Sequence, residues 1–180
     1  MNPARFGPLV GAIGGLVFML VNAGALTGAA PLLVRCLGAA AFALVIWFVS
    51  FRASGLQAPA APPTRRELLV YWACVGAMVV AIPLGAQAVD TVLGSPELTV
   101  CWVVLVVGAH FLPFAKAFDV PVFTPLAWTL IGLAAAGGAL TFTVTGRAAP
   151  WTGVLAGAVL LFFSAFGAHT GGRLRAGRSA

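Results

Sequence analysis

The residues that by type and spacing are best suited to support a chemical function lie in one short stretch. In it, His110 lies three positions before Pro113 and six before Lys116. Proline lacks a backbone N–H, and its ring clashes with the carbonyl group four positions earlier. Pro113 is therefore expected to bend a helix and to free the carbonyl of Ala109. An ionisable group beside a free acceptor in an apolar segment is a candidate functional site, although an imidazole near a segment end can also simply bond to backbone or water.

A second histidine, His169, gives the other candidate chemistry. Gly167 to His169 repeats the triplet that ends at His110, and two imidazoles at similar depth could hold a haem between parallel helices. The repeat is short, and His169 lies only four residues before Arg173. Haem ligation by His110 and His169 is therefore the alternative hypothesis, and the leading one includes no cofactor and no metal.

Other polar side chains are expected near the opposite ends of the apolar segments. Arg35 would be able to pair with Asp90 or Glu97, because hydrocarbon penalises an unpaired charge. Such a set could line a vestibule for a small polar solute, or its members could be interface anchors and helix caps. The set comprises Asn22, Arg35, Gln87, Asp90 and Glu97.

The chain lacks the common catalytic and nucleotide-binding signatures. It contains no G-x-S-x-G, no H-E-x-x-H, no P-loop and no pair of carboxylates inside an apolar run. The usual support for a hydrolase, a metalloprotease, an ATPase or an acid-pair proton pump is therefore missing. Cys36, Cys74 and Cys101 match no metal-ligand spacing, and we expect them to be packing residues. The sequence predicts a protein that is not an enzyme.

Composition decides the environment of these residues. Hydrophobic residues make up 61% of the 180 positions and charged residues 8%, whereas a soluble domain has about 25% charged residues. So few charged groups cannot cover such a domain in water, so lipid must surround most of it. The net charge of +6 comes from basic residues that lie mainly between apolar runs or at the termini. This distribution indicates membrane topology and not nucleic-acid binding.

Six apolar runs are long enough to cross a bilayer, since a helix needs about 20 residues to do so. We predict an all-α, polytopic transmembrane bundle that forms a single domain over residues 1–170, followed by a disordered basic tail over 171–180. The runs lack the alternation typical of a transmembrane barrel. The predicted helices are Pro8–Leu26, Pro31–Phe51, Leu68–Val89, Leu98–Ala115, Val122–Thr145 and Trp151–Ala168.

The first two helices are divided by no charged residue. A single helix from Pro8 to Phe51 would be about 66 Å long, roughly twice the hydrocarbon thickness. We therefore place a turn at Thr27 to Pro31, where glycine and proline favour one. The alternative is a cleaved signal peptide over residues 1–30, but the apolar run exceeds the roughly 7 to 15 residues of a typical signal core.

Six crossings place both termini on one side of the membrane. The basic residues on that side outnumber those on the other, which are Arg35 and Arg147. The positive-inside rule then predicts cytoplasmic termini in the plasma membrane. The residues on the cytoplasmic side are Arg5, Arg52, Arg65, Arg66, Lys116, Arg173, Arg175 and Arg178.

The stretch Gly108 to Ala115 has the pattern G-x-H-F-x-P-x-A, and a short charged turn and Pro121 follow it. It resembles a signature of small, uncharacterised bacterial integral membrane proteins with six helices. The resemblance implies a place in the bacterial inner membrane and no particular activity, so it assigns no role to His110 or Pro113.

G-x-x-x-G spacing occurs at Gly11–Gly15 and at Gly153–Gly157, and this spacing lets two helix backbones approach closely. We expect packing within the monomer, with a homo-oligomer through the same faces as the alternative. The leading functional hypothesis is a non-enzymatic integral membrane protein with an accessory or structural role, or one in small-solute transport. Membrane lipids are its expected partners.

Overall fold

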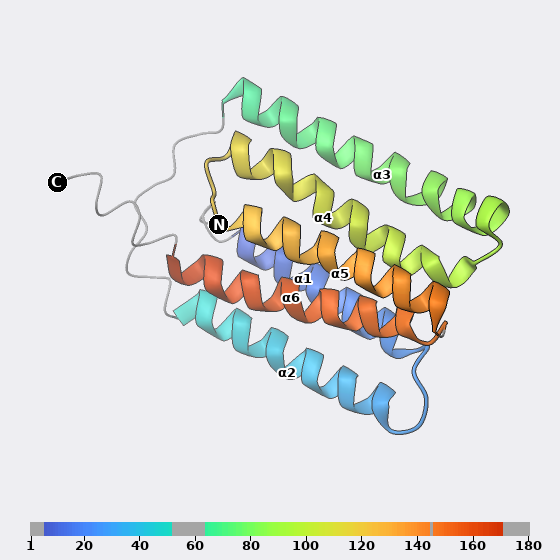
Figure 1. Cartoon of the computed structure of the whole chain (residues 1–180). Coiled ribbons are helices and arrows are strands. Elements are labelled where there is room, and N and C mark those ends of the chain that lie inside the picture. The colour runs from blue at the N-terminus through green and yellow to red at the C-terminus, as the bar shows by residue number, and fades with distance from the viewer. Residues whose placement is uncertain (1–5, 52–63, 145, 171–180) are drawn as a thin grey trace. The chain divides into compact units, whose positions relative to one another are not determined.

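The computed structural model describes residues 6–51, 64–144 and 146–170 (Figure 1). These residues form helices and contain no strand, which confirms the predicted all-α class. The predicted disordered tail, residues 171–180, lies outside the described residues. The elements are α1 (Phe6–Ala23), α2 (Ala30–Phe51), α3 (Arg65–Leu93), the short 3-10 helix η3 (Pro96–Leu98), α4 (Thr99–Ala117), α5 (Phe123–Thr143) and α6 (Ala148–Thr170).

Helix length and composition match a membrane environment. Among the described helices, α2, α3, α4 together with η3, α5 and α6 are each long and apolar enough to cross a bilayer. Helix α1 is apolar and shorter. Its 18 residues would reach about 27 Å, close to the roughly 30 Å of the hydrocarbon core.

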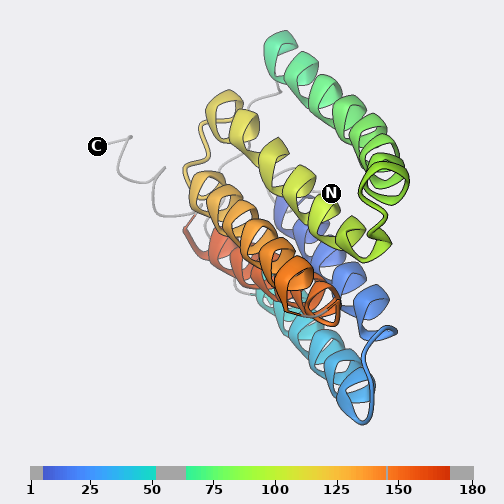
Figure 2. The same cartoon turned by 45° about the vertical axis from the view of Figure 1, so that its right-hand side comes forward.

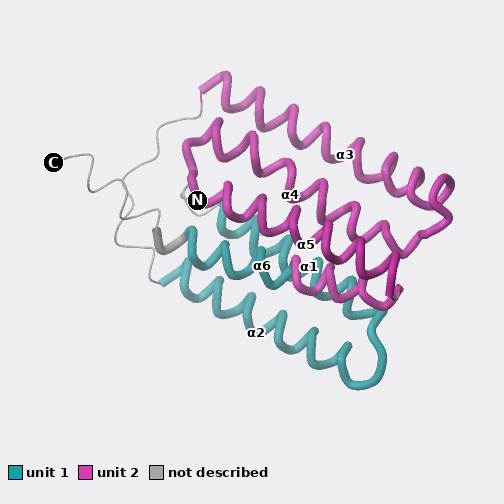
Figure 3. Tube along the Cα trace, viewed as in Figure 1, with its two compact units in different colours: residues 1–62, 157–180 teal, residues 63–156 magenta. Residues whose placement is uncertain are grey.

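The chain divides into two compact units, which Figure 3 shows in different colours. Unit 1 comprises residues 1–62 and 157–180, and so contains α1, α2 and the C-terminal part of α6. Unit 2 comprises residues 63–156, with α3, α4, α5 and the beginning of α6. In unit 2, α4 packs against α3 and against α5, and Figure 2 shows these three helices from a second direction.

The first helix ends earlier than predicted. Helix α1 stops at Ala23 and not at Leu26, because the next three N–H groups bond to carbonyls only three positions back, each at 3.2 Å. Gly28 then adopts a positive φ of 68°, a conformation that glycine takes without steric cost. The predicted turn before the second helix is therefore present and begins several residues earlier.

The third helix extends beyond both predicted ends. At its start, the Thr64 N–H donates to the Glu67 carboxylate at 2.6 Å, and the Glu67 N–H donates to the Thr64 hydroxyl at 3.3 Å. This capping box begins α3 at Arg65, three residues before the predicted Leu68. At the other end, Gly94 takes a left-handed φ of 59° and its N–H bonds to the Asp90 carbonyl at 3.1 Å. Asp90, which the predicted helix Leu68–Val89 leaves out, therefore lies in the last turn of α3.

Unit 1 is held together where α1 and α6 cross. A Cβ atom added to Gly15 would lie 2.7 Å from the carbonyl oxygen of Gly157, and one added to Gly157 would lie 2.5 Å from that of Gly15. The two backbones are therefore in direct contact, as small residues allow. This contact confirms, for Gly15 and Gly157, the prediction that the spaced glycines pack within the monomer.

Unit 2 has its core between α4 and α5. Val104 and Leu130 are fully buried there, and a Cβ atom added to Gly108 would lie 3.0 Å from the Leu130 side chain. Helix α3 contributes no buried residue. Its side of the unit is therefore formed by exposed apolar side chains, which suit a lipid environment.

Candidate functional site

His110 lies near the end of α4, where its ring bonds to the backbone of its own helix. The Nδ1 atom is 2.6 Å from the carbonyl oxygen of Val107. Because a carbonyl only accepts, Nδ1 must carry the proton, and the neutral ring then has its lone pair on Nε2. The imidazole is thus paired with Val107, whereas the carbonyl considered from the sequence was that of Ala109.

Aromatic rings surround His110. Its ring centroid lies 4.2 Å from that of Phe111 and 5.2 Å from that of Phe114. Phe114 also stacks on Tyr71 of α3 at 5.9 Å, and Phe111 lies 5.4 Å from Phe123 at the start of α5. This aromatic cluster joins the ends of three helices in unit 2, and its geometry is that of favourable ring packing.

Pro113 lies inside α4, and the helix continues beyond it to Ala117. Its side chain is exposed. After the helix, Asp119 adopts a positive φ of 51°, which aspartate tolerates better than most residues. The sequence pattern indicated a short charged turn here but not this backbone conformation.

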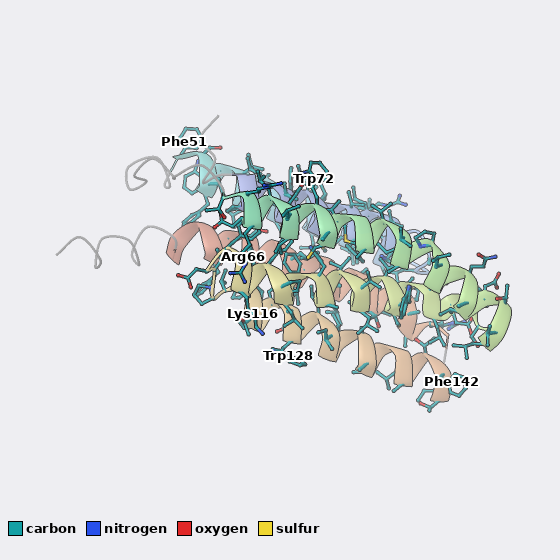
Figure 4. All side chains as sticks on the ribbon, turned by 90° about the horizontal axis from the view of Figure 1, so that it is seen from above. Phe51, Arg66, Trp72, Lys116, Trp128 and Phe142 are labelled. Atoms are coloured by element: carbon teal, nitrogen blue, oxygen red, sulfur yellow. The ribbon has the colours of Figure 1, made fainter. Side chains whose placement is uncertain are left out.

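Charged side chains gather at the two ends of unit 2. Figure 4 shows Arg66 and Lys116 at the same end, which is where α3 begins and α4 ends. Asp90 and Glu97 belong to the other end, in the last turn of α3 and in η3. Figure 4 also shows the Trp72 and Trp128 side chains on the outside of their helices, and Trp128 is 61% exposed.

The polar set predicted at the helix ends is divided between the two units. Asn22 is buried in unit 1, and its amide donates to the Phe18 carbonyl of the same helix at 2.8 Å. Arg35 is exposed in the same unit. Gln87, Asp90 and Glu97 are exposed in unit 2. A pair between Arg35 and one of these acids would join the units and stays a prediction.

The haem hypothesis involves both units as well. His110 belongs to unit 2, and the side chain of His169 lies outside the described residues. Within the described chain, no group of three or more His, Cys, Asp or Glu side chains is placed to hold a metal ion. Ligation of a haem by His110 and His169 stays a prediction.

A buried polar group that sequence reasoning missed lies where α4, α5 and α6 meet in unit 2. It consists of Cys101, Thr141 and Thr152, each less than 9% exposed. The Thr152 hydroxyl donates to the Ala148 carbonyl at 3.0 Å. The Thr141 hydroxyl forms no well-shaped hydrogen bond in the described structure, and the weakly polar thiol of Cys101 faces it. Isolated Cys and Thr residues in three apolar runs carry no pattern that would have revealed the group.

An apolar groove of about 220 Å³ lies between α3, α4 and α5 of unit 2. Trp102 forms part of its wall, and the indole N–H donates to the Ala81 carbonyl of α3 at 3.0 Å. Sequence reasoning also missed this groove, because its lining residues are ordinary apolar ones from three separate runs.

Together these features define an α-helical, multi-pass membrane protein. Comparison with protein-family models, with curated proteins and with solved structures finds no match to this chain.

Proposed function

We propose that this protein is a non-enzymatic, lipid-embedded protein with an accessory or structural role. The observation that carries the proposal is how the polar side chains of its helices use their hydrogen bonds. Each of several hydroxyl or amide groups donates to the carbonyl four positions earlier in its own helix, namely those of Asn22, Thr91, Thr129, Thr143, Thr152 and Ser164. A solute path or a reaction site needs polar groups that converge on a ligand. These groups instead donate their hydrogen bonds to the backbone of their own helices.

Reconstitution into proteoliposomes tests this role. The accessory role predicts that solute flux for purified wild-type protein equals that of empty liposomes, for ions and for small polar solutes. Measurable flux that His110→Ala or Asp90→Ala abolishes, in variants that still insert, would contradict it and support transport.

Transport of a small polar solute is the second candidate, and one observation favours it. Gln87, Asp90 and Glu97 are exposed at the same end of unit 2, where they could attract a cationic or polar solute.

A membrane redox protein is the third candidate function, because the bond from Nδ1 to Val107 leaves Nε2 of neutral His110 as a ligand atom. Purified protein without a Soret absorbance band would eliminate the haem hypothesis.

We also propose that both termini lie in the cytoplasm and that the protein resides in the plasma membrane, of bacterial inner-membrane type. The grouping of Arg65, Arg66 and Lys116 at one end of unit 2 supports this orientation through the positive-inside rule. A reporter active only outside the cytoplasm should give no signal when fused after Ala180 and a strong signal when inserted at Ser95. The opposite pattern would overturn the orientation.

Membership in the family with the G-x-H-F-x-P-x-A signature is also part of the proposal, as is self-association through glycine-rich faces. Gly15 and Gly157 already contact each other within unit 1. Glycines such as Gly14 and Gly132, where an added Cβ would meet no atom within 4 Å, are better placed for a second copy.

A further inference from the structure

The groove of unit 2 forms because α3 and α4 are in close contact around Gly85 and are farther apart toward the C-terminal end of α3. At Gly85 an added Cβ would overlap the Trp102 indole, so the two helices are in tight contact there. Val89 and Leu93, one and two turns further along α3, line the groove. Ala135 of α5 lines it as well, and its small side chain leaves the space of about 220 Å³ unfilled.

The lining of the groove is apolar and presents almost no free hydrogen-bond donor or acceptor. The N–H of Trp102 is already donated to Ala81, and the other lining residues, including Cys101, present apolar or only weakly polar side chains. A water molecule would find few hydrogen-bond partners in such a space. By contrast, an apolar cavity of about 150 Å³ can bind a benzene-sized molecule. A segment of hydrocarbon chain therefore suits the groove, and since α3 contributes no buried residue, lipid chains have access to this side of the unit.

Two carboxylates are adjacent in the chain to residues that line the groove. Asp90 directly follows Val89, and Glu97 directly precedes Leu98, which is also a lining residue. Both carboxylates are exposed near the helix ends, at the level expected for lipid headgroups. A primary ammonium has three N–H donors for such carboxylates, whereas a choline headgroup has none. Charge and hydrogen bonding therefore favour an amine-bearing headgroup at this place.

We propose that this groove binds one acyl chain of an aminophospholipid, of the phosphatidylethanolamine type, with its ammonium group at Asp90 and Glu97. The proposal does not depend on whether the protein also moves a solute. It makes a specific lipid part of the folded structure of unit 2.

Trp102 provides the test, because bromine atoms on an acyl chain quench a nearby indole. A variant that retains only Trp102, with Trp47, Trp72, Trp128 and Trp151 replaced by phenylalanine, is reconstituted in vesicles with brominated phosphatidylethanolamine or brominated phosphatidylcholine. We expect quenching to show a roughly two- to fivefold preference for the ethanolamine lipid, the range that exposed charge pairs supply. A matched variant that retains only Trp128, which is exposed on α5, should show no headgroup preference.

Substitutions separate the headgroup from the chain. Asp90→Asn with Glu97→Gln should remove the preference while quenching remains, and Asp119→Asn at the other end of the unit should not. Ala135→Leu should lower Trp102 quenching by both lipids, whereas Ala136→Leu, on a neighbouring residue that does not line the groove, should leave it unchanged.

Three results would overturn the proposal. Equal quenching by both lipids would show ordinary contact with bulk lipid, and unchanged quenching in Ala135→Leu would show that no chain occupies the groove. Quenching that falls as the protein-to-lipid ratio rises would place a second copy of the chain there instead. If Ala135→Leu does not fold, the carboxylate variants decide the outcome alone.

Discussion

The indole N–H of Trp102 on α4 donates a hydrogen bond to the carbonyl oxygen of Ala81 on α3, with 3.0 Å between the two heavy atoms. The bond forms because Gly85, one turn beyond Ala81, has no side chain where the indole ring lies. Helix α3 has no buried residue, so this contact and the stacking of Tyr71 on Phe114 are specific points at which it is held against α4.

The close contact at Gly85 predicts that adding one methyl group there lowers the unfolding free energy of the protein. Gly85→Ala would force the Trp102 ring to move, at a cost of about 1–3 kcal/mol in unfolding free energy. Gly76→Ala on the same helix is the matched control, because an added Cβ there meets no atom within 4 Å. Unfolding in mixed detergent micelles, followed by far-UV circular dichroism, measures both variants. Equal stability of the two would show that α3 is not packed on Trp102.

Loss of the indole donor should have a smaller effect. Trp102→Phe removes the hydrogen bond to Ala81 and keeps most of the ring, and hydrogen bonds between membrane helices contribute about 0.6 kcal/mol on average. We expect a loss of that size in the same unfolding assay. Combined with Gly85→Ala, the two losses should not add, because the smaller ring relieves part of the overlap. Full additivity would contradict the contact.

The crossing of α1 and α6 predicts a contrast between two adjacent glycines. Gly15→Ala places a methyl group against the Gly157 carbonyl, so it should destabilise the protein by about 1–3 kcal/mol. Gly14→Ala meets no atom within 4 Å and should be neutral or stabilising by up to about 1 kcal/mol, since alanine favours helix more than glycine does. Thermal unfolding in detergent distinguishes them, and the reverse order would rule out this crossing.

The buried Thr141 hydroxyl predicts a stabilising substitution. It lacks a well-formed hydrogen bond, so Thr141→Val should raise the unfolding free energy by about 1 kcal/mol by removing an unsatisfied buried group. Thr152→Val is the control, because its hydroxyl is bonded to Ala148 and its loss should be neutral or destabilising. If Thr141→Val proves the more damaging of the two, the Thr141 hydroxyl must be hydrogen-bonded in the folded protein.

The ring of His110 predicts a defined tautomer. The 2.6 Å contact with the Val107 carbonyl requires a proton on Nδ1, so the neutral imidazole should be the Nδ1–H form, the minor one for free histidine in water. Nitrogen-15 NMR of protein labelled at its two histidines, with His169→Gln to assign the signals, reports the protonated nitrogen directly. A proton on Nε2 at neutral pH would exclude the bond to Val107.

The sequence alone determined the fold class and the environment of this chain. A continuous apolar run of about 20 residues is stable across lipid as an α-helix, because its backbone N–H and C=O groups must then bond within the same helix. The number of helices followed from run length, as did the separation of α1 from α2, since no bilayer accommodates a helix from Pro8 to Phe51. The charge pattern likewise predicted that Lys116 and Arg66 belong to the same end of unit 2, as Figure 4 shows.

Tertiary structure decided what length and polarity leave open. The ends of α3 depended on the Thr64–Glu67 capping box and on the left-handed Gly94, which are local geometries that a hydropathy profile does not contain. The choice of Gly15 and Gly157 among 22 glycines depended on helix rotation, since only the face turned toward a neighbour needs a small residue. The same holds for Trp102, Thr141 and the groove. In a chain where nearly every face is apolar, which faces meet is set by the shape of the packed helices and not by their hydrophobicity.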